Sequence, residues 1–221
     1  MHIVGKAWAY YQEFGMRQLM RRIQHCETFA VFTKTLVTKQ AEQVYPDVDF
    51  RVAVAADERL LKGHTLLWEE SQGLPGASSR LKAGDLAVLG VASGDPTEVL
   101  YISWVTREDK LFCMCADSSE SVPQACSRRI WVPAQHRRRR LAERGLLFAE
   151  NAAFDAGVRR LWAFALRDNE ASIRLHEKLG YRQTGFLRIG RRLGKRIAQM
   201  QRSGTRHWQD LRAEPARGVP Q

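Results

Sequence analysis

A strand, helix, strand pattern in the last third of the chain constrains the fold more than any other sequence feature. Residues 127–132 have strand character and end at Pro133, which cannot donate a hydrogen bond within a sheet. Apolar and small residues then recur at helical spacing, and Gly157 stands where a helix commonly ends. The run 161–166 is apolar throughout, as expected for a strand covered on both faces. The pattern predicts two parallel strands joined by a helix of about four turns.

A second helix is predicted directly after the apolar strand. Asp168 and Asn169 supply helix-starting side chains, Lys178 falls in the last turn, and Gly180 ends the segment. A further strand is predicted over residues 181–189.

Upstream, the chain predicts five strands, at 27–36, 49–54, 86–92, 99–105 and 111–115. Turn-forming residues at 93–96 indicate that 86–92 and 99–105 pair as a hairpin. A helix is predicted over 56–70, followed by a loop over 72–77.

The N-terminal segment 1–45 is predicted to hold an amphipathic helix around residues 16–23 and the first strand. The helix either packs on its own domain, which we favour, or lies on an anionic membrane. We expect the main domain to span 46–200. Residues 201–221 then form a basic and polar tail, frayed beyond Trp208.

Charge limits the class of partner. Lysine and arginine exceed aspartate and glutamate by 35 to 24, giving a net charge of +11, so the expected partners are anions: nucleic acid, anionic lipid or a phosphate-bearing small molecule. The longest apolar run, 86–92, is far too short to span a bilayer, and no secretory signal is recognisable. A cytoplasmic location is therefore expected.

The four cysteines are too few and too scattered for a disulfide framework. Cys113, Cys115, Cys126 and His136 can be drawn as a zinc site, but their spacing matches no common zinc motif. We predict buried thiols on a strand and no metal.

Four consecutive arginines, residues 137–140, stand between the strand that ends before Pro133 and the helix that follows. Backbone amides are unpaired at a helix N-terminus and attract anions, and guanidinium groups bind phosphate oxygens in a forked geometry. The alternative is a solvated run of charge. Position favours phosphate binding, because four positive charges at a helix N-terminus oppose the helix dipole unless an anion is bound.

The segments 132–142 and 168–181, with the helix and strand between them, resemble the cofactor half of the GNAT superfamily of acyl-CoA N-acyltransferases. The resemblance implies an α/β (α+β) fold: a mixed, mostly antiparallel central sheet with one parallel strand pair, flanked by helices on both faces. It also implies acetyl-CoA as co-substrate. The backbone of Trp131 and Val132 would run beside the pantetheine arm, and Asn169 would contact the cofactor from the second helix. A plain helix cap explains Asn169 equally well.

The resemblance further implies that backbone amides of the loop hold the pyrophosphate; these belong to Arg137, Arg138, Arg139, Arg140, Leu141 and Ala142. The family motif, Arg/Gln-x-x-Gly-x-Gly/Ala, falls on Arg137, Arg140 and Ala142. Arginine thus replaces glycine at 140, and also at 138, where a second glycine is common. Glycine permits close backbone approach, so these exchanges bear on cofactor affinity.

Two residues are candidates for the acid that protonates the leaving thiolate. His176 stands where many members of the family have a tyrosine for this purpose, and histidine can carry out the same chemistry. Alternatively, His176 is a half-buried helix residue. Tyr181 is a weaker candidate that is better explained as part of the core. No base is assigned.

These features favour an N-acetyltransferase that moves an acetyl or other acyl group from acetyl-CoA to a primary amine of a small molecule or protein. One alternative is a binding module of this fold with a decayed cofactor site. Another is a nucleic-acid-binding protein that uses the arginine loop and a second basic patch at Arg188, Arg191, Arg192, Lys195 and Arg196. The last is not favoured, because the tryptophans are not interleaved with the basic residues as stacking platforms.

Overall fold

A computed structural model describes residues 26–41, 45–61, 76–107, 110–116, 121–192 and 195–211. The chain divides into two compact units. The larger unit comprises Phe32–Phe164 and Ala171–Arg182, and the smaller comprises Met1–Val31, Ala165–Glu170 and Gln183–Gln221. The amphipathic helix expected around residues 16–23 lies outside the described residues. The expected division at 45 and 200 stays a prediction.

The larger unit is built on a mostly antiparallel sheet that includes one parallel pair. Its strands lie side by side in the order β2 (Val48–Val52), β3 (Leu86–Ala92), β4 (Asp95–Thr106), β5 (Gln124–Trp131) and β6 (Arg160–Leu166). Neighbours from β2 to β5 are antiparallel, whereas β5 and β6 are parallel. The last part of β1 (Cys26–Thr35) lies next to β6. The predicted hairpin and the predicted parallel pair are confirmed.

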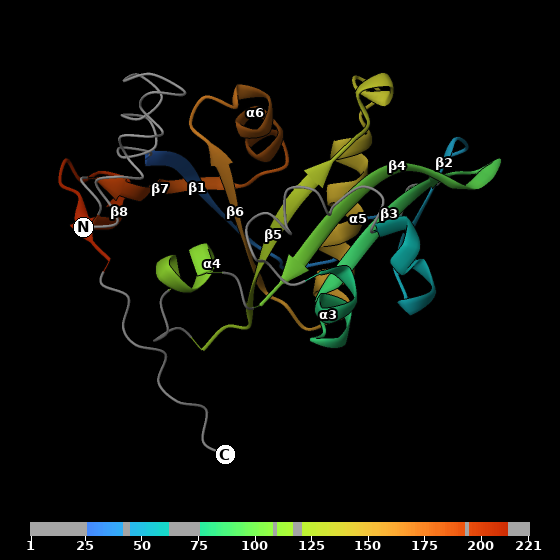
Figure 1. Ribbon diagram of the computed structural model, residues 1–221, viewed down its shortest axis with the longest axis horizontal. Helices are drawn as coiled ribbons and strands as arrows, with labels where there is room; N and C mark the ends of the chain where they lie inside the picture. The colour runs from blue at the N-terminus through green and yellow to red at the C-terminus, as the bar shows by residue number, and fades with distance from the viewer. Residues whose placement is uncertain are drawn as a thin grey trace, which may run out of the picture. The chain divides into compact units, whose positions relative to one another are not determined.

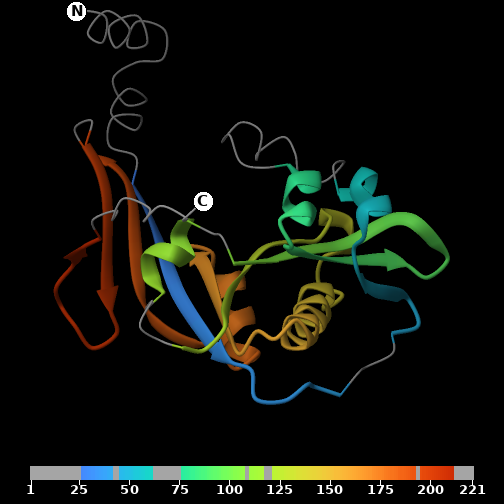
Figure 2. The ribbon, with the colours of Figure 1, turned by 90° about the horizontal axis from the view of Figure 1, so that it is seen from below.

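Helices cover both faces of this sheet. The helical elements are η1 (Ala55–Asp57), α3 (Ala77–Lys82), α4 (Lys110–Cys115), η2 (Ala134–His136), α5 (Leu141–Asp155) and α6 (Glu170–Lys178). Figures 1 and 2 show α5 and α3 on opposite faces of β3 and β4. Because side chains alternate along a strand, Ile102 and Trp104 pack in the core on the α3 face, and Tyr101 and Ser103 lie on the α5 face. The predicted helix caps are confirmed, since Gly157 and Gly180 both have positive φ.

Close approach of α5 to the sheet depends on Gly145. A Cβ atom at this position would overlap the ring of Tyr101, which is fully buried. The missing side chain therefore allows the Tyr101 ring to lie directly against the helix backbone. This contact fixes Tyr101 in the layer between α5 and the sheet.

The strand expected at 111–115 is wrong, because this segment is the helix α4. Periodicity alone cannot separate a short apolar run in a strand from one in a helix, and this run contains no β-branched residue that would favour a strand. The expectation of buried strand thiols holds only for Cys126: Cys115 is buried on α4, while Cys113 and Cys26 are exposed. The helix expected from 56 begins with η1, and helical residues are described to Leu61.

The smaller unit contains the first part of β1 beside β7 (Arg182–Arg192), β8 (Lys195–Arg202) and β9 (Gln209–Asp210), as Figure 2 shows for β1, β7 and β8. The sequence analysis did not predict β8, because its alternation of apolar and polar residues is short, covering residues 198–201 between charged ends. Arg188 stacks on the Trp208 ring at 4.2 Å. Regular structure thus continues to Asp210, past the point where a frayed tail was expected. None of the described helices is long and apolar enough to cross a membrane.

Candidate functional site

The parallel strands β5 and β6 separate part of the way along their length. They are paired from Gln124 opposite Arg160 to Ser127 opposite Ala163, and the pairing ends there. Just beyond, Arg129 has φ 59°, and the β4–β5 register shifts between Ile102 and Trp104. These features are those of a β-bulge, which bends a strand and increases its twist. We call this point, at Ser127 and Ala163, the split; Trp131 and Val132 lie beyond it on the β5 side.

The loop that carries the four arginines, residues 137–140, follows β5 and is called the arginine loop. Its backbone has a conformation that glycine normally provides. Arg138 and Arg140 have φ of 67° and 59°, in the left-handed region. The resemblance implies glycine at position 140 and commonly a second glycine at 138, so the loop keeps a glycine-like conformation with arginine side chains attached. Left-handed backbone costs a non-glycine residue about 1–2 kcal/mol. Residues that retain such strain concentrate at binding sites.

The loop presents a run of unpaired amides at the N-terminus of α5. Within the described residues, the backbone N–H groups from Arg138 to Glu143 have no hydrogen-bond acceptor, and the first amide bonded to the helix backbone is that of Arg144, to the Arg140 carbonyl at 3.0 Å. Arg140 is the N-cap, and its side chain makes no capping bond. Such amides, together with the helix dipole, form an anion site.

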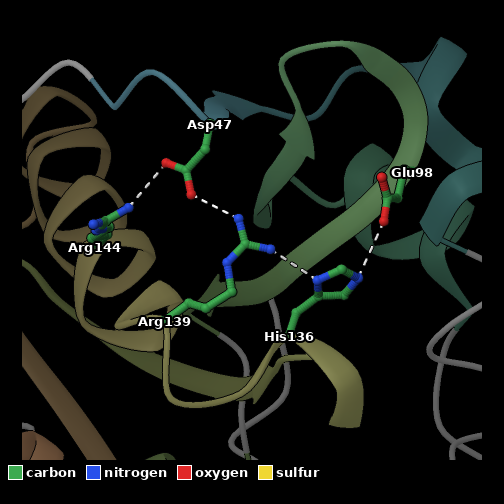
Figure 3. A network of polar contacts seen from close by, with 5 residues as sticks. All are labelled: Asp47, Glu98, His136, Arg139 and Arg144. Atoms are coloured by element: carbon green, nitrogen blue, oxygen red, sulfur yellow. Dashed lines mark hydrogen bonds and ion pairs between the residues drawn. The ribbon is translucent and has the colours of Figure 1, made fainter.

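The side chain of Arg139 is exposed but is held by contacts with other side chains. Its Nη2 donates to Asp47 Oδ2 at 2.8 Å, and its Nη1 lies 3.0 Å from His136 Nδ1 (Figure 3). Arg144 Nη1 donates to the other Asp47 oxygen at 3.2 Å. We call these contacts, with Glu98, the Asp47 network. The hydrogen bond from Arg139 lowers the pKa of the Asp47 carboxyl.

The contacts of the Asp47 network select one tautomer of His136. An arginine has only donors, so His136 Nδ1 must accept from Arg139, and the ring proton is on Nε2. That Nε2 lies 3.1 Å from Glu98 Oε1 and donates to it. The loop is therefore tied to the segment before β2 through Asp47 and to β4 through Glu98. Of the four loop arginines predicted to bind phosphate, Arg139 is already engaged by a carboxylate.

Exchange of Arg140 for glycine is expected to leave the free energy of unfolding unchanged or to raise it by up to about 1 kcal/mol. Relief of left-handed strain outweighs the larger backbone entropy of glycine in the unfolded chain. Arg137→Gly is the matched control, because it removes the same charge at a residue with φ −65°. It should lower stability by about 0.5–1 kcal/mol. Urea unfolding measures the free energy of unfolding of both variants. A similar loss of stability in the two would contradict backbone strain at Arg140.

Asp47→Asn is expected to lower the free energy of unfolding by about 0.5 kcal/mol at pH 7, as is typical of a half-exposed ion pair. The native pKa of Asp47 is below its unfolded value of 3.8. The contribution is thus complete above about pH 4 and is lost as the pH falls through the native pKa. Urea titrations at pH 7 and pH 2.5 should show a smaller difference from wild type at pH 2.5 than at pH 7. Asp49→Asn, an exposed neighbour, should show none at either pH.

His176 and Tyr181, the two candidates for the catalytic acid, are both buried. His176 is 2 % exposed, stacks on Phe32 at 5.4 Å, and its Nδ1 lies 2.7 Å from the Ser172 carbonyl. Nδ1 therefore carries the proton, and burial lowers the pKa of the ring. In this state Nε2 is a proton acceptor, which weighs against His176 as a resting acid. The role of His176 stays a prediction.

Tyr181 follows α6 and is 4 % exposed, with its ring 5.1 Å from that of His176. Burial and the nearby Glu150 carboxylate raise its pKa, so the hydroxyl keeps its proton. Lys34 Nζ lies 5.4 Å from the ring centroid and pairs with Glu150 Oε2 at 2.6 Å.

Asn169 precedes α6 in the smaller unit, where its backbone N–H donates to the Leu166 carbonyl at 2.9 Å. The expected cofactor contact of Asn169 stays a prediction.

Sequence reasoning missed Asp47, Glu98, Arg144, Lys34 and Glu150. Their partners lie far away in sequence, as in the pairs Asp47–Arg139 and Lys34–Glu150. No local spacing links such residues, although Glu150 was visible as a lone acid on the apolar stripe of the predicted helix. Among the described residues, no group of three histidine, cysteine or acidic side chains is arranged to hold a metal ion.

Comparison with protein families matches residues 87–181 to the acetyltransferase (GNAT) family. The matched segment contains β3 to α6, including the split and the arginine loop. Residues 87–181 thus match a GNAT acetyltransferase domain. The sheet, parallel pair and flanking helices that the resemblance implied are confirmed. A comparison of the sequence with curated proteins finds no match.

Solved structures with the GNAT fold are similar at low identity. A GCN5-related N-acetyltransferase from Sphaerobacter thermophilus is 14% identical with a TM-score of 0.53, over 78% of this chain and 55% of that one. A putative GNAT acetyltransferase from Novosphingobium aromaticivorans is 13% identical with a TM-score of 0.51, over 74% and 62%. A Drosophila protein is 14% identical with a TM-score of 0.55, and the match covers 81% of this chain and 56% of that one. This chain matches less than two thirds of the length of each.

Proposed function

We propose that the protein transfers an acetyl group from acetyl-CoA to a primary amine. The observation that carries this proposal is the loop after the split, where left-handed Arg138 and Arg140 leave a run of unpaired amides at the start of α5. A pyrophosphate is the group that such a run of amides fits. The family match supports acyl transfer as the reaction class.

In this proposal the loop amides and the guanidinium groups of Arg137, Arg138 and Arg140 hold the cofactor phosphates. The pantetheine arm runs along Trp131 and Val132 and brings the thioester to the split. A neutral amine then attacks the thioester carbonyl, the C–S bond breaks, and the sulfur takes a proton as the nitrogen loses one. Orientation of the two reactants at the split supplies much of the rate enhancement.

Calorimetric titration of the full chain with acetyl-CoA tests the proposal, with an Arg137→Ala, Asn169→Ala double variant for comparison. We expect saturable binding in the micromolar range that the double variant weakens. An amine panel, followed by release of the CoA thiol, then identifies the acceptor class. Absence of binding at millimolar acetyl-CoA would refute the proposal and favour a binding module of this fold.

Nucleic acid is the alternative ligand for the basic surface. It predicts an affinity for RNA or DNA that falls steeply with salt. The same preparation, titrated with a single-stranded oligonucleotide at two salt concentrations, separates the two functions.

A further inference from the structure

A cavity lies between α5 and the chain that leads into β2. Its volume is about 260 Å³, just below the range of about 300–1,000 Å³ that is typical of sites for drug-sized ligands. On α5 it is lined by a half-buried stripe at helical spacing, formed by Arg144, Leu147, Phe148 and Asn151. Residues before β2 and at its start form the opposite wall. The space therefore fits a ligand with about one ring and a short side chain.

Three aromatic rings form the apolar part of the cavity, which we call the aromatic wall. The ring centroid of Phe50 lies 5.9 Å from that of Tyr45 and 6.1 Å from that of Phe148. Phe50 also packs edge-on against the buried ring of Tyr101 at 5.7 Å. A Cβ atom on Gly90 would overlap the Phe50 ring, so glycine leaves room for it. Phe50 is thus held in place, and the wall offers faces and edges against which a flat ring packs favourably.

Asn151 and Gln40 tie the two sides of the cavity together. The backbone N–H of Gln40 donates to Asn151 Oδ1 at 2.9 Å, and Asn151 Nδ2 donates to the Gln40 carbonyl at 3.1 Å. Both polar atoms of the Asn151 side chain are therefore engaged within the protein. Among the α5 residues that line the cavity, Arg144 is the one whose polar group is available to a ligand.

Arg144 brings a positive charge to the cavity. Its guanidinium carbon lies 4.4 Å from the Tyr45 ring centroid, and its Nη1 donates to Asp47 Oδ1 at 3.2 Å (Figure 3). Its Nε and Nη2 have no acceptor among the residues that the structure describes. Asp47 is shared with Arg139, so one carboxylate faces two guanidinium groups. The charge of Arg144 is therefore only partly compensated.

The acidic residue of the lining, Asp49, faces away from the aromatic wall. Its neighbours Val48 and Phe50 pack in one cluster with Leu141 of α5. Because side chains alternate along a strand, Asp49 points to the opposite side of β2, where it is exposed. The cavity thus combines aromatic rings with a cation, which favours a ligand that has a ring and a negative charge.

The cavity is separate from the split. It borders β2, and the strands β3 and β4 lie between β2 and β5 in the sheet. At about 4.8 Å per strand, β2 and β5 are about 14 Å apart. On α5, the cavity begins at Arg144, after the amides proposed to hold the pyrophosphate. A ligand in this cavity is therefore a different molecule from the thioester and the amine that meet at the split.

We propose that this cavity is a binding site for a small aromatic carboxylate. The ring packs against the aromatic wall, and the two carboxylate oxygens accept hydrogen bonds from Nε and Nη2 of Arg144. These two nitrogens lie on one edge of the guanidinium group, and arginine commonly binds carboxylates through such a pair of parallel bonds. The inference goes beyond the proposed function and does not depend on it.

The first test is an NMR titration of the full chain with phenylacetate and with phenylacetamide. The two probes have the same ring and nearly the same shape, but only phenylacetate is charged at pH 7. We expect phenylacetate to bind saturably with a Kd of about 1 mM or less, as is typical of a ligand of this size. Phenylacetamide should bind at least about 10-fold more weakly, because it lacks the charge-assisted hydrogen bonds. Equal affinity of the two probes, or no saturation by phenylacetate at tens of millimolar, would overturn the proposal.

Two variants test whether binding occurs in this cavity. Arg144→Gln should reduce the affinity for phenylacetate to that for phenylacetamide, and Phe148→Ala should weaken the binding of both probes. The matched control is Arg159→Gln, which removes an arginine that stacks on the Phe154 ring at 4.1 Å near the other end of α5. The control should bind phenylacetate as wild type does, and circular dichroism checks the fold of each variant. Wild-type affinity for phenylacetate in a folded Arg144→Gln variant would show that the carboxylate binds elsewhere.

A titration with phenylacetate in the presence of saturating acetyl-CoA separates this cavity from the proposed cofactor site. We expect the Kd for phenylacetate to change by less than about twofold, because the two ligands occupy different places. Displacement of phenylacetate by acetyl-CoA would assign the cavity to the cofactor and overturn the second site. A protein that binds phenylacetate but no acetyl-CoA would refute the proposed function and support this inference.

Discussion

Replacing Lys34 with methionine is expected to lower the free energy of unfolding by about 3 kcal/mol at neutral pH. The substitution removes the only cation bonded to Glu150 among the described residues, whose side chain is 2 % exposed. An uncompensated buried carboxylate costs about 3–5 kcal/mol, far more than the pair itself contributes. Urea unfolding at pH 7, against wild type, measures the loss.

The pH dependence of the Lys34→Met variant identifies the cause. Burial raises the native pKa of Glu150 above its unfolded value, and loss of Lys34 raises it further. The native state then binds more protons than the unfolded state, so stability falls as pH rises through the native pKa. The variant should recover part of its loss between pH 7 and pH 5. A loss that is the same at both values would point to packing instead.

A double variant provides the matched control. Lys34→Met with Glu150→Leu replaces the pair by apolar groups of similar size, which is often neutral or stabilising for buried pairs. It should regain most of the stability that the single variant loses, and it should lack the recovery at pH 5 that Glu150 gives the single variant. If the double variant is less stable than Lys34→Met alone, the charge at Glu150 is not the source of the defect.

Ala142→Glu is expected to weaken acetyl-CoA binding at least 100-fold. The residue is the second of α5, and its amide is one of those proposed to hold the pyrophosphate. A carboxylate there repels the phosphates, whereas an acidic residue in the first helical turn favours the helix dipole. The variant should therefore keep its fold while losing its ligand. Calorimetry gives the affinity, and circular dichroism with thermal melting reports the fold.

Ala152→Glu is the matched control for this experiment. Ala152 lies on the same helix with similar partial exposure, but in its last turn, away from the arginine loop. It should bind acetyl-CoA as wild type does. Equal affinity of the Ala142→Glu variant and wild type would remove the loop as the cofactor site and with it the basis of the proposed mechanism.

The elements that the sequence predicts best are those with local signals. The segments that became α5 and α6 combine helical spacing with a glycine at the end, and β6 is an unbroken apolar run. The position of the arginine loop follows from the same pattern. Neither β8 nor α4 has such a signal, because packing rather than spacing decides their conformation.

The sequence predicted where the candidate phosphate site lies better than it predicted the conformation and contacts of the residues that form it. The sequence shows where phosphates would bind, but not that Arg138 and Arg140 keep a glycine-like backbone, since arginine disfavours it. It also cannot show that Arg139 faces Asp47, because that contact joins residues separated by 92 positions.

The position of β1 affects the order in which the chain can fold during synthesis. This strand comes early in the chain, yet its neighbours in the sheet are β6 and β7, which come late. A strand containing Phe29, Val31 and Phe32 must therefore wait unpaired on the ribosome until nearly all of the sequence has emerged. Strand pairs that are far apart in sequence form slowly, and until they form the unpaired strand edges can aggregate. We expect refolding to end with the closing of this strand, and yields to improve when chaperones shield it.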